Sequence, residues 1–304
     1  MSWSALLGLA IVLGLAPLLP GVAAKTRARL TGRRGAPLLQ LYRDLARLWR
    51  KGVVYSRTTT FAFRVAPVVL VVTAVLAACL VPLDGRRALV GFSGDFVAFA
   101  ALLALGRFAL VLAAWDTGSS FEGMGASREV TVAAFAEPAL FLTFVALVLA
   151  SGSLSLGGAL GAPLAAAWPS AAPALALVTA SLFLVLLAEG SRVPVDDPAT
   201  HLELTMIHEV MVLDHSGLDL ALILYGGALK LSLFGALLVG AVAPRAEIPP
   251  AIAVGVLVAG LLVVAMAVGV VESVMARLRL SRVPQFLTAA SALAALAVIL
   301  LLVR

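Results

Sequence analysis

Long unbroken apolar runs constrain this chain more than any other feature of its sequence. A helix needs about 20 apolar residues to cross the hydrocarbon core of a bilayer. The sequence contains eight such runs, at residues 3–23, 62–83, 92–115, 131–151, 170–189, 218–242, 249–272 and 284–303. Strands of a membrane barrel would alternate polar and apolar residues, whereas these runs are continuously apolar. We therefore predict an all-α integral membrane protein with about eight transmembrane helices.

The composition supports the same fold class. Hydrophobic residues make up 62% of the 304 residues and charged residues only 12%, against about 25% charged in soluble domains. This balance excludes a water-soluble protein, a disordered protein and a nucleic-acid-binding domain. The first run is longer than the apolar core of a signal peptide, so we expect a retained helix. We treat residues 1–304 as a single membrane domain.

The distribution of Lys and Arg predicts the orientation of the chain. Eight crossings place both termini on one side. Sixteen of the 22 Lys and Arg residues fall in or beside one set of loops, at residues 24–61, 116–130, 190–217 and 273–283. The positive-inside rule puts these loops in the cytoplasm and both termini outside. We expect a multi-pass protein of a bacterial or archaeal cytoplasmic (inner) membrane.

The first of these loops contains a predicted amphipathic helix. Its apolar residues recur at helical spacing, at Leu38, Leu41, Tyr42, Leu45, Leu48 and Trp49. Such a helix lies in the membrane interface. The loop either fixes the topology and binds anionic lipid or docks a cytoplasmic subunit. The candidate docking residues are Arg27, Arg29, Arg33 and Arg34 in this loop, together with Asp116, Arg128 and Arg192 in the later cytoplasmic loops.

Ionisable residues within the spans are the next signal, because a charge in hydrocarbon costs roughly 2.5–3.5 kcal/mol. Arg107 and Glu137 lie at the same depth, roughly 10–12 Å from the cytoplasmic ends of their spans at 1.5 Å per residue. We expect the two to pair, either as a structural ion pair or as part of a functional network. Lys230 lies in the middle of its span, so it must face a protein interior, water or a buried acid.

Acidic residues gather on the predicted cytoplasmic side. Glu189 and Glu272 lie at the mouths of their spans, and further acids crowd residues 190–217. Adjacent or partly desolvated carboxylates have raised pKa values and can exchange protons near neutral pH. The proton-relay candidates are Glu137, Glu189, Asp196, Glu203, Glu209, Glu272, Arg107 and Lys230. For each acid the alternative is an ordinary solvated or structural group.

No catalytic or metal site is predicted in the chain itself. His201, His208 and His215 are spaced by seven, which is too far along one helix to share a metal. The single cysteine, Cys79, cannot hold an iron–sulfur cluster, which needs about four ligands. Nucleotide-binding loops are also missing. Any electron-carrying cofactor would therefore belong to a partner.

Three stretches of sequence resemble the complex I subunit 1 family. The first combines KTRAR at residues 25–29 with RRGAP at 33–37. The second combines GRF at 106–108 with DTGSSFEGMGASRE at 116–129, and the third runs from Glu189 through the acidic loop to HEVM at 208–211. The last two stretches are similar to the branch found in formate hydrogenlyase and related membrane-bound [NiFe]-hydrogenases.

This resemblance implies a membrane anchor and coupling subunit of a multi-subunit redox complex. Such a protein docks hydrogenase-like large and small subunits and iron–sulfur proteins, with nickel–iron in the large subunit. It adjoins antiporter-like membrane subunits and links electron transfer to proton or Na⁺ translocation. The resemblance also places Glu189, Asp196 and Glu203 in a carboxylate chain between the redox arm and the membrane.

Two alternatives stay open. The first is a quinone-site subunit of a complex I-like dehydrogenase, which a long apolar cavity beside the amphipathic helix would favour. Quinone-reducing members are richer in Glu where Ala199 and His201 stand here, which argues against quinone. The second is a stand-alone secondary ion transporter, although the internal repeats typical of that class are not evident.

Overall fold

The protein is an all-helical membrane protein, as predicted. The computed structural model describes residues 3–86, 88–196, 206–244 and 248–303, and these residues form helices and no strand. Seven of their helices are long and apolar enough to span a membrane, or up to eight if a bent N-terminal pair counts as one span. The helices are α1 (Trp3–Leu15), α2 (Leu18–Leu30), α3 (Gln40–Trp49), α4 (Phe61–Leu80), α5 (Asp95–Asp116), α6 (Ser120–Ser151), α7 (Leu156–Ala159), α8 (Ala162–Glu189), η1 (Glu209–Val212), α9 (Gly217–Val242), α10 (Pro250–Val274), η2 (Leu280–Arg282) and α11 (Val283–Val303).

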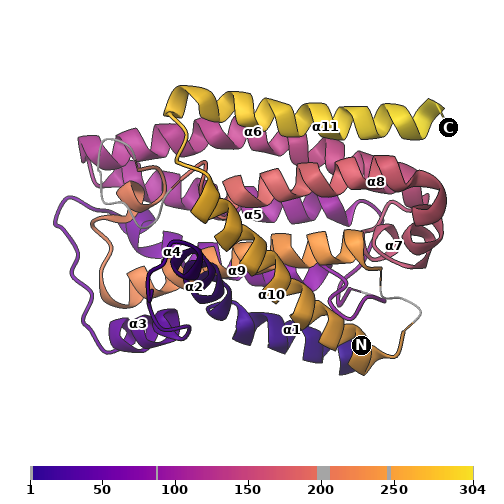
Figure 1. The fold of residues 1–304 in the computed structure, drawn as a ribbon. Coiled ribbons are helices and arrows are strands. Elements are labelled where there is room, and N and C mark those ends of the chain that lie inside the picture. The colour runs from indigo at the N-terminus through magenta and orange to yellow at the C-terminus, as the bar shows by residue number, and fades with distance from the viewer. Residues whose placement is uncertain (1–2, 87, 197–205, 245–247, 304) are drawn as a thin grey trace.

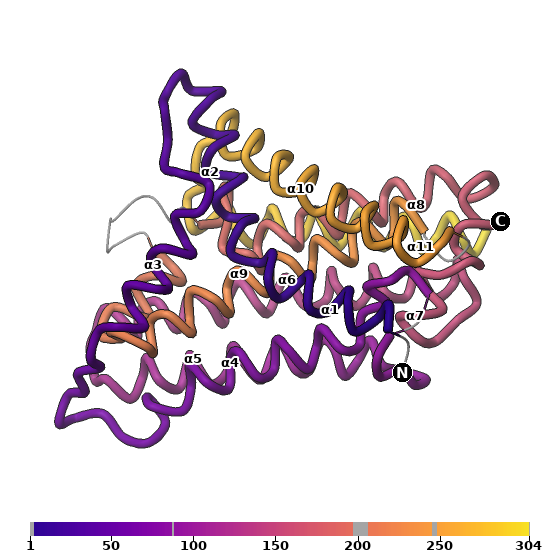
Figure 2. The backbone as a smooth tube through the Cα atoms, turned by 90° about the horizontal axis from the view of Figure 1, so that it is seen from below, coloured from indigo at the N-terminus to yellow at the C-terminus, as the bar shows by residue number. Residues whose placement is uncertain are grey.

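The spans form a bundle around α9. In α9, 78% of the 18-residue apolar stretch is buried within the chain, against 22% of the corresponding stretch in the last span. Helix α4 lies along α5, α11 packs on α6 and α8, and α10 crosses in front of α9 to reach α2 (Figure 1). Both chain ends lie at the same end of the bundle as α7, and α3 lies at the other (Figures 1 and 2). We call the end with residues 31–60 the basic end and the end with α7 the far end.

The sequence predicts a single helix at residues 3–23 for the first crossing. In the structure this crossing is broken into two helices. Helices α1 and α2 meet at Pro17 with a bend of 50°. Pro17 has no N–H to donate to the Leu13 carbonyl, which instead accepts a hydrogen bond from the Tyr225 hydroxyl at 2.9 Å. The next carbonyl, Gly14, accepts from the hydroxyl of Tyr42. Side-chain hydroxyls thus satisfy the backbone carbonyls that the bend frees, and this stabilises the bend.

Several helices extend beyond their apolar runs. Helix α2 continues to Leu30, so residues 24–30 of the predicted first loop are helical. Helix α6 begins at Ser120 rather than near 131, and α8 begins at Ala162 rather than near 170. The predicted amphipathic helix is present as α3, which packs on α9 and α2 with no fully buried residue.

Glycines allow the central helices to approach closely. A Cβ at Gly106 of α5 would lie 2.6 Å from Thr73 Oγ1 of α4. A Cβ at Gly226 of α9 would lie 2.7 Å from Leu70 Cδ2, also of α4. Small residues of this kind permit tight packing where lipid offers no hydrophobic drive for association. They fix the positions of α5 and α9, the helices that carry Arg107 and Lys230.

Candidate functional site: a buried ionic network

Arg107 is the centre of a cluster of charged side chains inside the bundle. Its guanidinium group donates a hydrogen bond to Glu137 Oε1 at 2.7 Å, as the equal depths of the two residues suggest. It also donates to Glu189, and its Nε lies 3.6 Å from Glu129 Oε1. Because Arg107 is only 8% exposed, these three carboxylates compensate a charge that the bilayer would otherwise penalise.

Glu189 links Arg107 to a second cation. Lys230 Nζ lies 3.0 Å from Glu189 Oε2, so Lys230 faces a buried acid, one of the environments predicted for it. Lys230 lies near the middle of α9, whereas Glu189 is the last residue of α8. The end of α8 is therefore level with the middle of the neighbouring span, and Glu189 lies deeper than the predicted span mouth. The network connects α5, α6, α8 and α9.

Among the described residues, the network has one more acid than base. Three carboxylates, of Glu129, Glu137 and Glu189, face the two cations Arg107 and Lys230. Four of these side chains are at most 12% exposed, and Glu137 is the exception at 41%. The network therefore carries a surplus negative charge among mostly buried groups.

Two further ion pairs lie beside the network at the basic end. Arg192 Nη1 lies 3.5 Å from Glu272 Oε1, and Arg277 Nη2 lies 3.2 Å from Asp196 Oδ1. The other oxygen of Asp196 accepts a hydrogen bond from the backbone N–H of His208 at 3.0 Å. These contacts tie the segments after α8 and α10 together. Glu203 and His201 lie outside the described residues, and Glu209 is half-buried in η1.

A cavity of about 590 Å³ leads from the basic end to this network. At one side it is lined by α2, α3 and the segment between them, including Arg27, Arg33 and Asp44. At the other side it is lined by five polar residues of the network and its surroundings: Glu189, Arg192, His208, Lys230 and Glu272. Desolvation lowers the pKa of His208, which favours its neutral form. The cavity therefore joins the predicted docking loop to the buried charges.

The docking candidates separate into two groups. Arg29, Arg33 and Arg34 are exposed at the basic end, and Arg27 is half-buried where it lines the cavity. The remaining three candidates are held within the chain. Asp116 Oδ2 accepts the backbone N–H of Thr60 at 2.6 Å and so caps α4. Arg128 donates to the Met206 carbonyl at 2.8 Å, and Arg192 pairs with Glu272.

Glu129 is a member of the network that the sequence places among the cytoplasmic loop acids but not among the proton-relay candidates. It lies in a predicted loop, but in the structure it belongs to α6. The pattern Ser119-x-x-Glu122 is typical of a helix start and would have extended α6 past Glu129. With α6 extended, Glu129 and Glu137 fall two turns apart on one helix, within reach of the same cation.

His215 forms a further feature that sequence patterns do not reveal. Its ring stacks on Phe63 with centroids 3.9 Å apart and an interplanar angle of 7°. The side chain is 4% exposed, and burial lowers its pKa to about 4. Across the described ranges, no group of three or more His, Cys, Asp or Glu side chains is arranged to hold a metal ion.

The helical bundle and its charged interior define the class of this chain, a multi-pass membrane protein with a buried ionic network. The family model for NADH dehydrogenase matches residues 3–303. The chain therefore belongs to the NADH dehydrogenase family, which agrees with the resemblance to complex I subunit 1.

Relatives within this family are components of larger complexes. The chain is 33% identical to hydrogenase-4 component C of Escherichia coli over 77% of its length and 73% of the relative's. It is 30% identical to formate hydrogenlyase subunit 4 of Escherichia coli over 96% of each chain. It is 26% identical to a subunit of the NADH-quinone oxidoreductase of Rhodospirillum rubrum over 70% of its own length and 63% of that protein's.

A solved structure shares the fold. A chain of the membrane-bound sulfane sulfur reductase, an archaeal respiratory membrane complex, superposes with a TM-score of 0.80 over 98% of both chains. The sequence identity is 17%, so this likeness concerns the fold alone.

Proposed function

We propose that this chain is the membrane anchor and coupling subunit of a redox complex resembling formate hydrogenlyase or hydrogenase-4. The observation that carries the proposal is the cavity that runs from the basic loop to the Arg107–Glu189–Lys230 network. A change in a docked module would reach buried charges through this cavity without crossing a packed core. The names and coverage of the two hydrogenase-type relatives support the same assignment.

The surplus acid of the network supports a role in proton handling. A proton taken up beside Glu189 would neutralise the extra negative charge, and its release would restore it. Glu137 lies on the surface of α6 at the other side of Arg107, with 41% of its side chain exposed. A carboxylate at this depth is costly in lipid. In the proposal, an antiporter-like membrane subunit covers Glu137 and accepts the proton.

The basic end supports the docking role. Arg29, Arg33 and Arg34 are exposed beside the mouth of the cavity. In the proposal this end faces the cytoplasm of a bacterial or archaeal cell, as its positive charge favours. An acidic surface on a hydrogenase-like partner would complement these arginines. The iron–sulfur clusters and the nickel–iron centre would reside in that module, not in this chain.

The coupling role is tested with Glu189→Gln in the intact complex. Membrane vesicles receive formate, NADH and H₂ in turn as electron donors, and both electron transfer and uptake of H⁺ or Na⁺ are recorded. We expect the variant to assemble and transfer electrons, with ion uptake per electron reduced at least about tenfold. Asp214→Asn, which alters an exposed acid that does not line the cavity, is the matched control and keeps wild-type uptake. Equal uptake in Glu189→Gln and wild type would refute the relay.

The docking role is tested separately by reversing two arginines. Arg33→Glu combined with Arg34→Glu places two acids at the basic end, and we expect the peripheral module to be lost on purification from membranes. Arg304→Glu, at the other end of the sequence, is the charge-reversal control. Co-purification of iron–sulfur proteins with both variants would contradict the docking surface.

Quinone binding is a second candidate function with one observation in its favour. The cavity lies beside the amphipathic helix α3, where a quinone site is expected, and its 590 Å³ falls in the usual range for ligand sites. Its inner end, however, is charged rather than apolar. Binding of a ubiquinone analogue that is abolished by Gly227→Leu at the cavity wall would favour this function over a site without quinone.

A further inference from the structure

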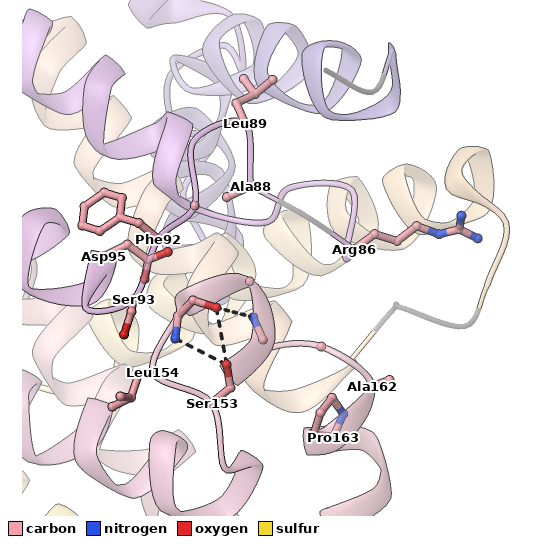
Figure 3. Close-up of a pocket in the computed structure, with 15 residues that line it drawn as sticks. Arg86, Ala88, Leu89, Phe92, Ser93, Asp95, Ser153, Leu154, Ala162 and Pro163 are labelled. Carbon is pink, nitrogen blue, oxygen red and sulfur yellow. Dashed lines mark hydrogen bonds between the residues drawn. The ribbon is translucent and has the colours of Figure 1, made fainter.

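A second cavity lies at the far end of the bundle, away from the ionic network. Its volume is about 830 Å³, and it opens between Arg86 with residues 88–95 on one side and residues 153–163 on the other (Figure 3). Ser93 and Asp95 form one wall, and Ser153, Ser155 and Pro163 belong to the opposite side. Asp95 begins α5, whereas Arg107 lies more than three turns further along the same helix. The two cavities are therefore independent features of the fold.

Among the described residues that line this cavity, Asp95 is the only acid, and one of its two carboxyl oxygens accepts no hydrogen bond from them. The side chain is fully buried. Its Oδ1 accepts the backbone N–H of Leu156 at 2.6 Å and so holds the start of α7 in place. Its Oδ2 has no hydrogen-bond partner among the residues that the structure describes. The backbone N–H groups of Phe92 and Phe96 also act on the carboxyl group, but the capping bond to Leu156 uses only one oxygen of Asp95.

Two hydroxyl groups that can accept hydrogen bonds belong to the same cavity. The hydroxyls of Ser153 and Ser155 lie 3.4 Å apart at the cavity wall. Arg86 also lines the cavity, but its guanidinium group extends away from Asp95 and donates to the Ile248 carbonyl at 3.3 Å (Figure 3). Divalent cations in proteins are usually held by several oxygen ligands, often including more than one carboxylate. One carboxylate among neutral oxygens suits a monovalent, hydrogen-bonding cation.

We propose that this far-end cavity binds a primary ammonium group, with Asp95 as its counter-ion. An ammonium group carries three N–H donors, enough to bind Asp95 Oδ2 and the neighbouring serine hydroxyls together. The charge-assisted bond to Asp95 would provide most of the selectivity. Gly91 lies over the same oxygen, because a Cβ built there would be 3.9 Å from Oδ2. A larger side chain at Gly91 would compete with the ligand.

The rim of the cavity indicates where such an ammonium group comes from. Phe92 and Leu154 are 49% and 56% exposed on the two sides of the opening. Apolar side chains at the end of a transmembrane bundle contact acyl chains, while the polar floor lies at headgroup level. An ethanolamine phospholipid meets both requirements. A soluble primary amine offers the same ammonium group without using the apolar rim.

The test uses the complex purified in detergent and transferred to nanodiscs. The probes are phosphatidylethanolamine, phosphatidylglycerol and soluble ethanolamine, and bound molecules are counted by native mass spectrometry. We expect wild type to retain phosphatidylethanolamine in preference to phosphatidylglycerol. Asp95→Asn keeps an acceptor oxygen for the Leu156 N–H but removes the charge, and we expect it to lose this preference about tenfold.

Two further variants make the result decisive. Asp84→Asn changes another buried far-end acid, whose Oδ2 accepts a hydrogen bond from Ser4 at 2.7 Å and which does not line the cavity. It keeps the wild-type preference. Gly91→Leu occupies the part of the cavity beside Asp95 Oδ2 while leaving Asp95 intact, and it loses the lipid. Saturable ethanolamine binding that needs Asp95, without lipid preference, assigns the ammonium to a soluble amine. Equal retention of both lipids together with no Asp95-dependent ethanolamine binding overturns the proposal.

Discussion

Lys230 Nζ lies 3.0 Å from Glu189 Oε2, which joins the middle of α9 to the last residue of α8. Glu189 is bound on its other oxygen by Arg107. One carboxylate therefore bridges two cations from different helices. Removing any one of the three leaves a charge in the bundle with fewer partners, which is the basis for the first prediction.

Lys230→Met is expected to destabilise the protein by about 3 kcal/mol. This is the low end of the cost of breaking a buried ion pair, because Arg107 still compensates the charge of Glu189. The double variant Lys230→Met with Glu189→Gln should lose less stability than the two single variants lose in sum, since it leaves no unpaired acid. Unfolding in mixed detergent micelles, followed by circular dichroism, measures both effects. Strictly additive losses would show that the two side chains are not coupled.

Glu137→Gln should separate stability from function. Its side chain is 41% exposed, so the pair with Arg107 contributes less than about 1 kcal/mol to the isolated chain. We expect an almost unchanged melting temperature but reduced ion uptake in vesicles that contain the complex. The combination of a normal melting temperature and normal uptake would remove Glu137 from the proposed path.

Tyr225→Phe should weaken the bend in the first crossing. The substitution leaves the Leu13 carbonyl without the hydroxyl that replaces the missing N–H of Pro17. An unsatisfied buried carbonyl costs about 1–3 kcal/mol. Tyr42→Phe removes the companion bond to Gly14 at an exposed position and should cost less. Hydrogen exchange of residues 12–20 reports the local effect, and equal exchange in wild type and Tyr225→Phe would contradict it.

His215 should make stability depend on pH in one direction. Burial lowers the pKa of its imidazole to about 4 in the folded chain, against about 6.5 when unfolded. Between these values the unfolded state binds the extra proton, so stability is complete above pH 6.5 and falls as the pH drops towards 4. The total is about 3 kcal/mol, at 1.36 kcal/mol per pKa unit.

The matched variant for this effect is His215→Phe, which preserves a ring to stack on Phe63 but cannot titrate. Melting temperatures of both proteins are compared from pH 7 to pH 4. We expect the difference between them to change by several degrees in favour of the variant as the pH falls. Parallel curves would show that another group causes the acid sensitivity.

Much of the fold follows from the sequence because hydropathy alone locates the spans. Equal depth is enough to predict the pair of Arg107 and Glu137, and a mid-span position is enough to bury Lys230. The depth of Glu189 does not follow in the same way. It depends on where α8 starts, at Ala162, and on the departure from helical geometry at Ala171 between two prolines. Apolar runs mark the hydrocarbon but not the full length of a helix that continues past it.

The break at Pro17 does not follow from the sequence for a related reason. Proline lowers helix stability locally, but whether a span bends there depends on partners such as Tyr225, which lies more than 200 residues away in the sequence. The place of Glu129 in the network is not predicted from the sequence, because helix α6 extends into a polar segment that is predicted as a loop. In both cases tertiary contacts decide the outcome, and a single sequence does not contain them as a periodic pattern.

The position of Glu189 at the very end of α8 has a consequence for the cations around it. The C-terminus of a helix carries about half a negative charge, although the carbonyls of Leu186, Leu187 and Ala188 accept backbone N–H bonds from residues 190–192. If Glu189 takes up a proton, as the proposed relay requires, Arg107 keeps Glu129 and Glu137 as partners and Lys230 keeps the partial negative charge of the helix end. In the proposed relay, the end of α8 would therefore lower the cost of neutralising Glu189 beside Lys230.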